Sequence, residues 1–389
     1  MSYEKADKLA QKRTSNLRLG ILILVLLLIT AFGFMHQWLQ TARIAGVDAL
    51  CPFGGIEAAF TLFSTGAFIQ RIAISSLILL VSTILIALVF RRAFCGQICP
   101  LGTLQELSGM LGKKLFKKSL VMPVSIDKPG RYLKYIILLV VVVFSAWTSE
   151  LVLRPYDPWV AYMHLSSAEV FSTFLVGLII LIVALLGSML VGRVFCRYLC
   201  PMGAFLAIMY PLGWFGVKRN DETCIKCKIC NRECPMSIDI MGAEKVTSSE
   251  CINCYTCVNV CPVKDTMVIE GRQEKKLTAS HAIVLVLSLF IIVVAATTAT
   301  GQFQWTTKSL QTQVQQTGSF DPELIKGKMT LQEVVDSSTI PKEAFKEKFK
   351  IKDADFQVPI KELATPYGFE AEQVREFARE YLVQHEPGK

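Results

Sequence analysis

Apolar residues gather in long runs along this chain instead of alternating with polar ones. A helix needs about 20 mostly apolar residues to cross a lipid bilayer, and five stretches meet that need: residues 19–38, 72–90, 133–151, 170–191 and 282–298. They hold no Asp, Glu, Lys or Arg apart from Lys134 and Glu150, which lie next to the two ends of the third stretch. The pattern predicts a mainly α-helical integral membrane protein with five transmembrane helices.

Composition supports this interpretation, since 52% of the 389 residues are hydrophobic. The first run has one alternative role, that of a signal peptide, because Lys12, Arg13 and Arg18 precede it. It is long for that purpose, and no small-x-small cleavage site follows it. We therefore expect a retained membrane anchor.

The net charge of +9 is explained by where the basic residues lie. They cluster before the first run and between the second and third: Lys5, Lys8, Lys12, Arg13 and Arg18, then Arg91, Arg92, Lys113, Lys114, Lys117, Lys118, Lys128, Arg131 and Lys134. The opposite loops hold mainly Arg43, Arg71 and Arg154. This asymmetry predicts a cytoplasmic N terminus and an extracytoplasmic C terminus. It points to membrane lipid as the partner of the basic residues, and not to nucleic acid.

The membrane part contains a repeat. The pattern F-C-x3-C-P-x-G occurs at residues 94–102 and again at 195–203, each time directly after an apolar run. Both halves read as apolar run, outer loop, apolar run and motif, with Cys51 of the first outer loop standing where Arg154 stands in the second. Parallel repeats are commonly related by an axis along the membrane normal. We therefore expect residues 18–215 to form a duplicated four-helix unit with its two motifs close together.

The rest of the chain divides by composition. Residues 1–17 form a basic segment, residues 216–277 a cysteine-rich soluble insert, residues 278–300 the fifth helix, and residues 301–389 an outer tail. The tail has a weak repeat, starting at Thr330 and at Pro359. Thr330 and Glu333 have the spacing of a helix capping box, so we expect short helical hairpins there.

Eight of the 13 cysteines form two runs of the pattern C-x2-C-x2-C-x3-C-P. In bacterial ferredoxins with this pattern the fourth cysteine binds the other cluster. The runs therefore predict two [4Fe-4S] clusters, one held by Cys224, Cys227, Cys230 and Cys261, the other by Cys251, Cys254, Cys257 and Cys234. Zinc sites favour paired C-x2-C motifs or histidine, and the insert has no histidine. Disulfides are not expected in the cytoplasm.

Four more cysteines lie in the repeated motif: Cys95, Cys99, Cys196 and Cys200. Each pair has i, i+4 spacing at a helix end, and Pro100 and Pro201 disfavour continued helix at the preceding cysteine. Two such pairs supply four thiolates in one neighbourhood. Our hypothesis is a third iron–sulfur cluster at the membrane boundary. A redox-active thiol site and a purely structural role, as small buried hydrophobes, are the alternatives.

With these motifs the chain resembles the membrane-bound polyferredoxins of the NapH type, which are related to the membrane part of NosR and to the oxidase-assembly protein CcoG. The resemblance covers roughly residues 15–270. It implies a bacterial inner-membrane electron carrier, often regarded as a quinol dehydrogenase that feeds a periplasmic or extracytoplasmic reductase. The fifth apolar run and the outer tail depart from this pattern, and the S-G-A-T flavin attachment sequence of NosR is absent.

Two outer loops offer further candidates. Quinone binding or proton relay is one interpretation of the polar and aromatic groups in the second loop, and an interfacial belt is the other; these groups are Arg154, Tyr156, Asp157, Trp159 and His164. The role of Cys51 is open, beside Gly54 and Gly55, which permit close backbone approach. Haem binding is not supported, because the sequence has no C-x-x-C-H motif and only His36 and His164 offer a pair of axial ligands towards one side.

The sequence therefore predicts a membrane-bound iron–sulfur electron-transfer protein that works with a redox partner protein. Its donor, either quinol or a cytoplasmic carrier, and the direction of electron flow stay open, and so does enzymatic activity as a quinol dehydrogenase. The alternative is a redox-sensing or assembly protein whose outer helical tail docks a partner.

Overall fold

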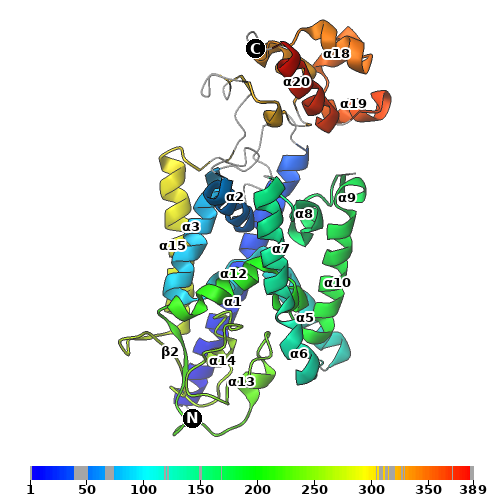
Figure 1. Ribbon diagram of the computed structural model, residues 1–389. Helices are drawn as coiled ribbons and strands as arrows, with labels where there is room; N and C mark the ends of the chain where they lie inside the picture. Colours follow the sequence, from blue (N-terminus) through cyan, green and yellow to red (C-terminus); the bar gives the residue numbers. More distant parts are fainter. Residues whose placement is uncertain are drawn as a thin grey trace. The chain divides into compact units, whose positions relative to one another are not determined.

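The computed structural model describes residues 2–38, 51–65, 74–117, 120, 122–148, 151–167, 169–303, 305, 310, 311, 314, 320–325, 327, 329–369 and 371–385. The chain divides into two compact units. One contains the elements α1 to α15, and the other contains the elements from η5 to α20. The fold is mainly helical (Figure 1).

Long apolar helices form the first unit. They are α1 (Ser2–Trp38), α3 (Ile74–Phe90), α7 (Leu133–Thr148), α10 (Leu175–Val191) and α15 (Ala279–Ala299). By length and composition three described segments suffice to cross a membrane: Leu9–Trp38 of α1, Val124–Thr148 and α15. The helices α3 and α10 have 17 residues each. They end where the backbone reaches positive φ, at Arg91 and Gly192. Both are shorter than the about 20 residues of a typical transmembrane helix, so five spans stay a prediction.

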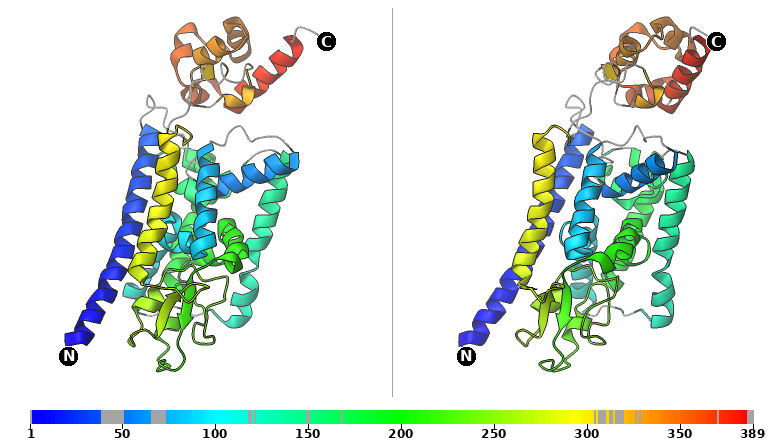
Figure 2. Two further views of the ribbon diagram at one scale, coloured as in Figure 1. Left: turned by 90° about the vertical axis from the view of Figure 1, so that its left-hand side faces the viewer. Right: turned by 60° about the vertical axis from the view of Figure 1, so that its left-hand side comes forward.

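These helices run in alternating directions. The start of α15 and the N-terminal half of α1 lie at one end of the unit, and the two helices are side by side in both views of Figure 2. The last turn of α3 is at the same end, because the Leu88 and Val89 carbonyls accept hydrogen bonds from Trp214 and Phe215 at 3.0 and 2.8 Å. The cysteine-rich insert lies at this end.

Shorter helices connect and brace the long ones. They are α2 (Pro52–Thr65), α4 (Ala93–Gln97), α5 (Pro100–Phe116), α6 (Val124–Gly130), η3 (Arg154–Tyr156), α8 (Pro158–Met163), α9 (Glu169–Ser172), α11 (Val194–Tyr198), α12 (Pro201–Met209) and η4 (Tyr210–Leu212). Gly55 allows α2 to pack tightly on α3, as expected: a Cβ there would be 2.6 Å from the Ser76 carbonyl oxygen. On the other side of the unit the Ser108 hydroxyl of α5 donates to the Leu185 carbonyl of α10 at 2.6 Å.

The insert combines a small sheet with two single helical turns. Its strands are β1 (Gly216–Arg219), β2 (Met267–Glu270) and β3 (Lys276–Leu277), in antiparallel order β1-β2-β3. The turns are α13 (Ile229–Arg232) and α14 (Thr256–Asn259), one within each cysteine run. Buried Val217, Met267 and Ile269 join the sheet to the core of the first unit.

The second unit is built from η5 (Pro322–Leu324), α17 (Leu331–Ser337), α18 (Lys342–Phe349), η6 (Asp353–Gln357), α19 (Ile360–Tyr367) and α20 (Ala371–His385). Thr330 caps α17 by accepting a hydrogen bond from the Glu333 backbone N–H at 3.1 Å, as the spacing predicts. Thr330 and Pro359 form an isolated bridge that pairs the starts of the two repeated segments. The buried side chains of Leu331, Phe345 and Ile360 share one apolar core.

Candidate iron–sulfur sites

The first ferredoxin-type cavity lies towards the surface of the insert. It is lined by Cys224, Cys227, Cys230 and Cys261. Cys227 is exposed, while the other three thiols are half-buried. The Gln11 side chain of α1 donates a hydrogen bond to the Cys261 carbonyl at 3.0 Å. This bond ties the insert to α1 beside the cavity.

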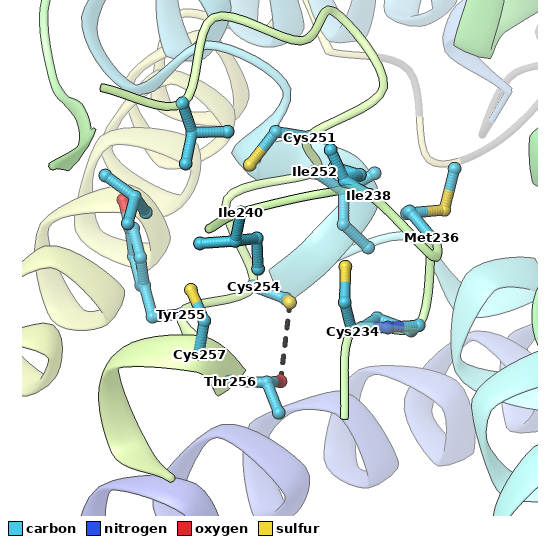
Figure 3. A pocket seen from close by; sticks show the side chains of 13 residues that line it. Cys234, Met236, Ile238, Ile240, Cys251, Ile252, Cys254, Tyr255, Thr256 and Cys257 are labelled. Atoms are coloured by element: carbon cyan, nitrogen blue, oxygen red, sulfur yellow. Dashed lines mark hydrogen bonds between the residues drawn. The ribbon is translucent and has the colours of Figure 1, made fainter. Parts of the chain in front are cut away.

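The second cavity is buried beneath it. Its lining includes Cys234, Cys251, Cys254 and Cys257. Figure 3 shows these sulfur atoms around a common space, bordered by the apolar side chains of Ile238, Ile240 and Ile252. The cysteines lining the two cavities are thus grouped as the spacing predicts, with the last cysteine of the first run joining the second cavity.

Backbone conformation explains how the short runs surround a cavity. In each run the residues two and four places after the first cysteine have positive φ: Lys226 (56°) and Lys228 (60°), Asn253 (45°) and Tyr255 (58°). Alternating left-handed and right-handed residues turn successive backbone N–H groups towards one concavity, an arrangement known from anion and iron–sulfur sites. Both runs therefore present N–H donors together with thiols.

The two cavities differ in electrostatic environment. The backbone N–H of Lys226 lowers the pKa of the Cys224 thiol at the surface. In the second cavity burial raises the pKa of Cys251 to about 11 and that of Cys234 to about 12. Burial therefore favours the neutral thiol at these two positions.

These cavities fit a cluster better than a single metal ion. Among the described residues no three Cys, His, Asp or Glu side chains converge closely enough to hold one ion, whereas zinc requires ligand atoms about 2.0–2.3 Å from one point. All thirteen cysteines are free thiols. Each cavity is lined by four of these thiols, which is the number of ligands of a [4Fe-4S] cluster.

The two membrane motifs have the same local conformation. The short helices α4 and α11 end just before the second cysteine, whose backbone N–H donates to the motif phenylalanine: Cys99 to Phe94 at 3.0 Å and Cys200 to Phe195 at 2.9 Å. The helical conformation therefore stops at the second cysteine of each pair, as the following proline predicts. Pro100 and Pro201 start new helices, so Cys99 and Cys200 become extended N-cap residues.

All four thiols of these motifs nevertheless come together in the interior. Cys95 and Cys196 are buried, and electrostatic interactions link Cys200 with Cys95, Cys99 and Cys196. The Gln105 amide donates to the Cys196 sulfur at 3.2 Å, and the Gly203 backbone N–H to the Cys200 sulfur at 3.3 Å. We call Cys95, Cys99, Cys196 and Cys200 the junction site.

The junction site adjoins the second ferredoxin cavity. A Cβ at Gly96, within the first motif, would collide with the Ile252 carbonyl oxygen and lie 3.1 Å from the Cys254 nitrogen. The neighbouring Gln97 amide donates to the Asn253 carbonyl at 2.9 Å. Asn253 in turn donates to the Phe90 carbonyl at 2.8 Å. Only a residue without a side chain permits this approach.

Buried charged residues surround the junction site, and of these the sequence had marked only Arg18, Arg92 and Lys134, as signals of membrane topology. Arg18 and Arg193 both pair with Glu106, at 2.6 and 2.5 Å. Lys134 and Arg92 both pair with Glu250, at 2.5 and 3.5 Å. Although burial opposes ionisation, Arg193 and Arg18 lower the pKa of Glu106 to about 2. An available signal was the arginine three residues before the first cysteine of both motifs.

The other candidates take part in local structure. Asp157 caps α8 by accepting a hydrogen bond from the Trp159 N–H at 2.8 Å. His164 is buried, with its ring 4.4 Å from that of Phe174, and Arg154 lies over the same Phe174 ring. The Ser76 hydroxyl donates to the Cys51 carbonyl at 3.1 Å.

Two domain families match the chain. The family described as a 4Fe-4S binding domain matches residues 72–119 and again residues 173–220, each of which contains one membrane motif. The family described as a 4Fe-4S dicluster domain matches residues 216–262, which contain both ferredoxin runs. The chain therefore carries 4Fe-4S domains in its membrane part and in its insert.

Known proteins with similar sequences come from bacteria and archaea. A putative electron transport protein of Escherichia coli, YccM, is 31% identical over 58% of this chain and 64% of its own length. An uncharacterized protein of Methanocaldococcus jannaschii is 36% identical over 52% of this chain and 79% of its own length. The ferredoxin-type protein NapH of E. coli is 28% identical over 49% of this chain and 66% of its own length. No solved structure matches the chain.

Proposed function

Since this chain belongs to the family of membrane-associated ferredoxin-type polyferredoxins with 4Fe-4S domains, we propose that it passes electrons between a quinol or cytoplasmic donor and a reductase partner. The observation that carries the proposal is the adjacency of three four-cysteine sites within one unit. Bound iron–sulfur clusters supply one-electron chemistry at such sites.

The chain's own residues would hold two [4Fe-4S] clusters in the insert. Cys224, Cys227, Cys230 and Cys261 would bind the first, and Cys234, Cys251, Cys254 and Cys257 the second. The exposure of Cys227 supports access of a cytoplasmic redox protein to the first cavity. The apolar lining of the second excludes water.

The junction site would hold a third cluster. Its four thiols meet in the interior, and the 4Fe-4S binding domain family matches both segments that supply them. Close packing of Gly96 against the second ferredoxin run joins this site to the insert. The matching hydrogen bonds of the two motifs support the proposal of an internal parallel repeat.

The family and three apolar helices mark a membrane protein. We infer five spans, because the apolar α3 and α10 alternate in direction with α1, α7 and α15. The basic residues before α1 and between α3 and α7 support a cytoplasmic insert in a bacterial inner membrane. The helical C-terminal unit would then face outside, where a reductase could bind.

Quinone exchange tests this function directly. The full chain, purified anaerobically in detergent, is reduced with dithionite, separated from excess reductant and mixed with a water-soluble quinone analogue. We expect the visible absorbance of oxidised iron–sulfur centres to return as the quinone takes up two electrons and two protons. A cytoplasmic-type ferredoxin serves as the second oxidant, to distinguish the two exchange partners.

A reduced protein that neither oxidant reoxidises would contradict the carrier function. Redox-dependent binding of the C-terminal unit to another protein, without turnover, would then favour the sensing or assembly role. The match to a regulatory protein, NosR of Pseudomonas aeruginosa, at 32% identity over 22% of that protein, makes this the second candidate.

A further inference from the structure

Two buried arginines lie between the junction site and the second ferredoxin cavity. Arg92 and Arg193 are 0% and 1% exposed. Each stands three residues before the first cysteine of its motif. They are therefore equivalent residues of the two repeated segments, and neither is in contact with solvent.

Each arginine reaches across to the opposite motif. Arg193 donates to the Cys95 carbonyl at 2.6 Å, and a Cβ at Gly102 would lie 3.0 Å from its Nη1 atom. On the other side a Cβ at Gly203 would lie 3.1 Å from Nη2 of Arg92. The glycine that ends each motif thus leaves room for the guanidinium of the other motif.

The same guanidinium groups also face the second ferredoxin run. Arg92 donates to the Ser249 carbonyl at 2.5 Å and interacts electrostatically with Cys95 and Cys200. Arg193 interacts electrostatically with both Cys196 and Cys254. The Nε atom of each arginine is buried and has no hydrogen-bond partner among the described residues. Each side chain therefore has a donor left over between two thiol sites.

Buried cations outnumber acids around the junction site. The buried cations are Arg18, Arg92, Lys134 and Arg193. The acids that pair with them in the described part of the chain are Glu106 and Glu250. Uncompensated buried charge is strongly destabilising. The excess therefore requires negative charge from thiolate-bearing groups close by.

We propose that Arg92 and Arg193 are positioning residues that balance the negative charge of the junction site and raise its reduction potential. This inference rests on the proposed cluster at that site. Reduction adds one negative charge to a thiolate-bound centre, and a nearby fixed cation stabilises the more negative form. Net charge and hydrogen bonds are known to set the potentials of such centres.

A redox titration followed by EPR on the anaerobically purified full chain, with dithionite as reductant, tests this role. We expect Arg193→Gln to retain its iron and to lower the ratio of reduced to oxidised junction sites about tenfold at a given potential. This change corresponds to a reduction potential about 59 mV more negative. Arg193→Lys keeps the charge and is expected to restore most of the shift. Arg232→Gln is the matched control, since that side chain is 72% exposed.

The outcomes separate the inference from the function on which it rests. A third EPR signal that is present but unshifted in Arg193→Gln would overturn the role of the arginine alone. Absence of a third signal from the unsubstituted protein would overturn the junction cluster. If Arg193→Gln does not fold, Gly102→Ala displaces the same guanidinium from the opposite motif. A negative shift in that variant supports the inference, and an unchanged potential contradicts it.

Discussion

Replacing Cys196 with serine is expected to remove about four irons per chain, since one [4Fe-4S] cluster would lose a ligand. The effect should be confined to the junction site, because the eight ferredoxin cysteines line separate cavities. Iron and acid-labile sulfide, measured on the anaerobically purified variant, would fall together. The signals of the two insert sites in EPR would persist. Cys95→Ser should give the same result, since both thiols face one site.

Cys51→Ser is the matched control. Cys51 directly precedes α2, and its carbonyl accepts a hydrogen bond from the Ser76 hydroxyl. It belongs to none of the three cysteine sets. The iron content of the Cys51→Ser variant should equal that of the unsubstituted protein. Full iron and unchanged EPR signals in both Cys95→Ser and Cys196→Ser would contradict the junction cluster and leave those thiols a structural role.

Replacing Gly96 with alanine is expected to separate the first motif from the second ferredoxin run. The new methyl group would collide with the Ile252 carbonyl oxygen, and the nearby backbone atoms of Cys254 leave it no room to shift. Overpacking of this kind costs about 1–3 kcal/mol. Thermal unfolding in detergent, followed by circular dichroism, should show a lower midpoint. Reoxidation by the quinone analogue should also slow, because the insert would no longer seat against the junction site.

Gly20→Ala provides the comparison. A Cβ at this position of α1 meets nothing within 4 Å, and alanine favours helix over glycine by up to about 1 kcal/mol. This variant should be as stable as the unsubstituted protein or more so. Equal midpoints for the two alanine variants would mean that close packing at Gly96 does not hold the insert in place.

Cysteine spacing made the ferredoxin cavities predictable. In bacterial ferredoxins with this pattern the fourth cysteine binds the other cluster, so the pattern alone predicted that Cys234 joins the second run. The long apolar helices were likewise visible, because burial in lipid demands continuous apolar stretches. Thr330 as a helix cap followed from local spacing as well.

Features that depend on distant partners were not predictable. Strand β1 pairs with β2 in the register Gly216 to Glu270, and neither segment shows a clear alternating pattern. Glu106 is an ordinary helical acid until folding brings Arg18 and Arg193 to it. The spacing of Cys95 and Cys99, with Pro100 after them, predicted where the helix ends. Local spacing could not show which distant residues the two thiols would meet.

Iron and acid-labile sulfide per chain, measured on the unsubstituted protein purified anaerobically in detergent, test the central claim most directly. EPR of the reduced protein identifies the centres that hold the iron. Three four-cysteine sites predict about twelve irons and about twelve sulfides per chain. About eight of each, with signals from the two insert sites alone, would contradict a cluster at the junction of the membrane helices and the ferredoxin insert.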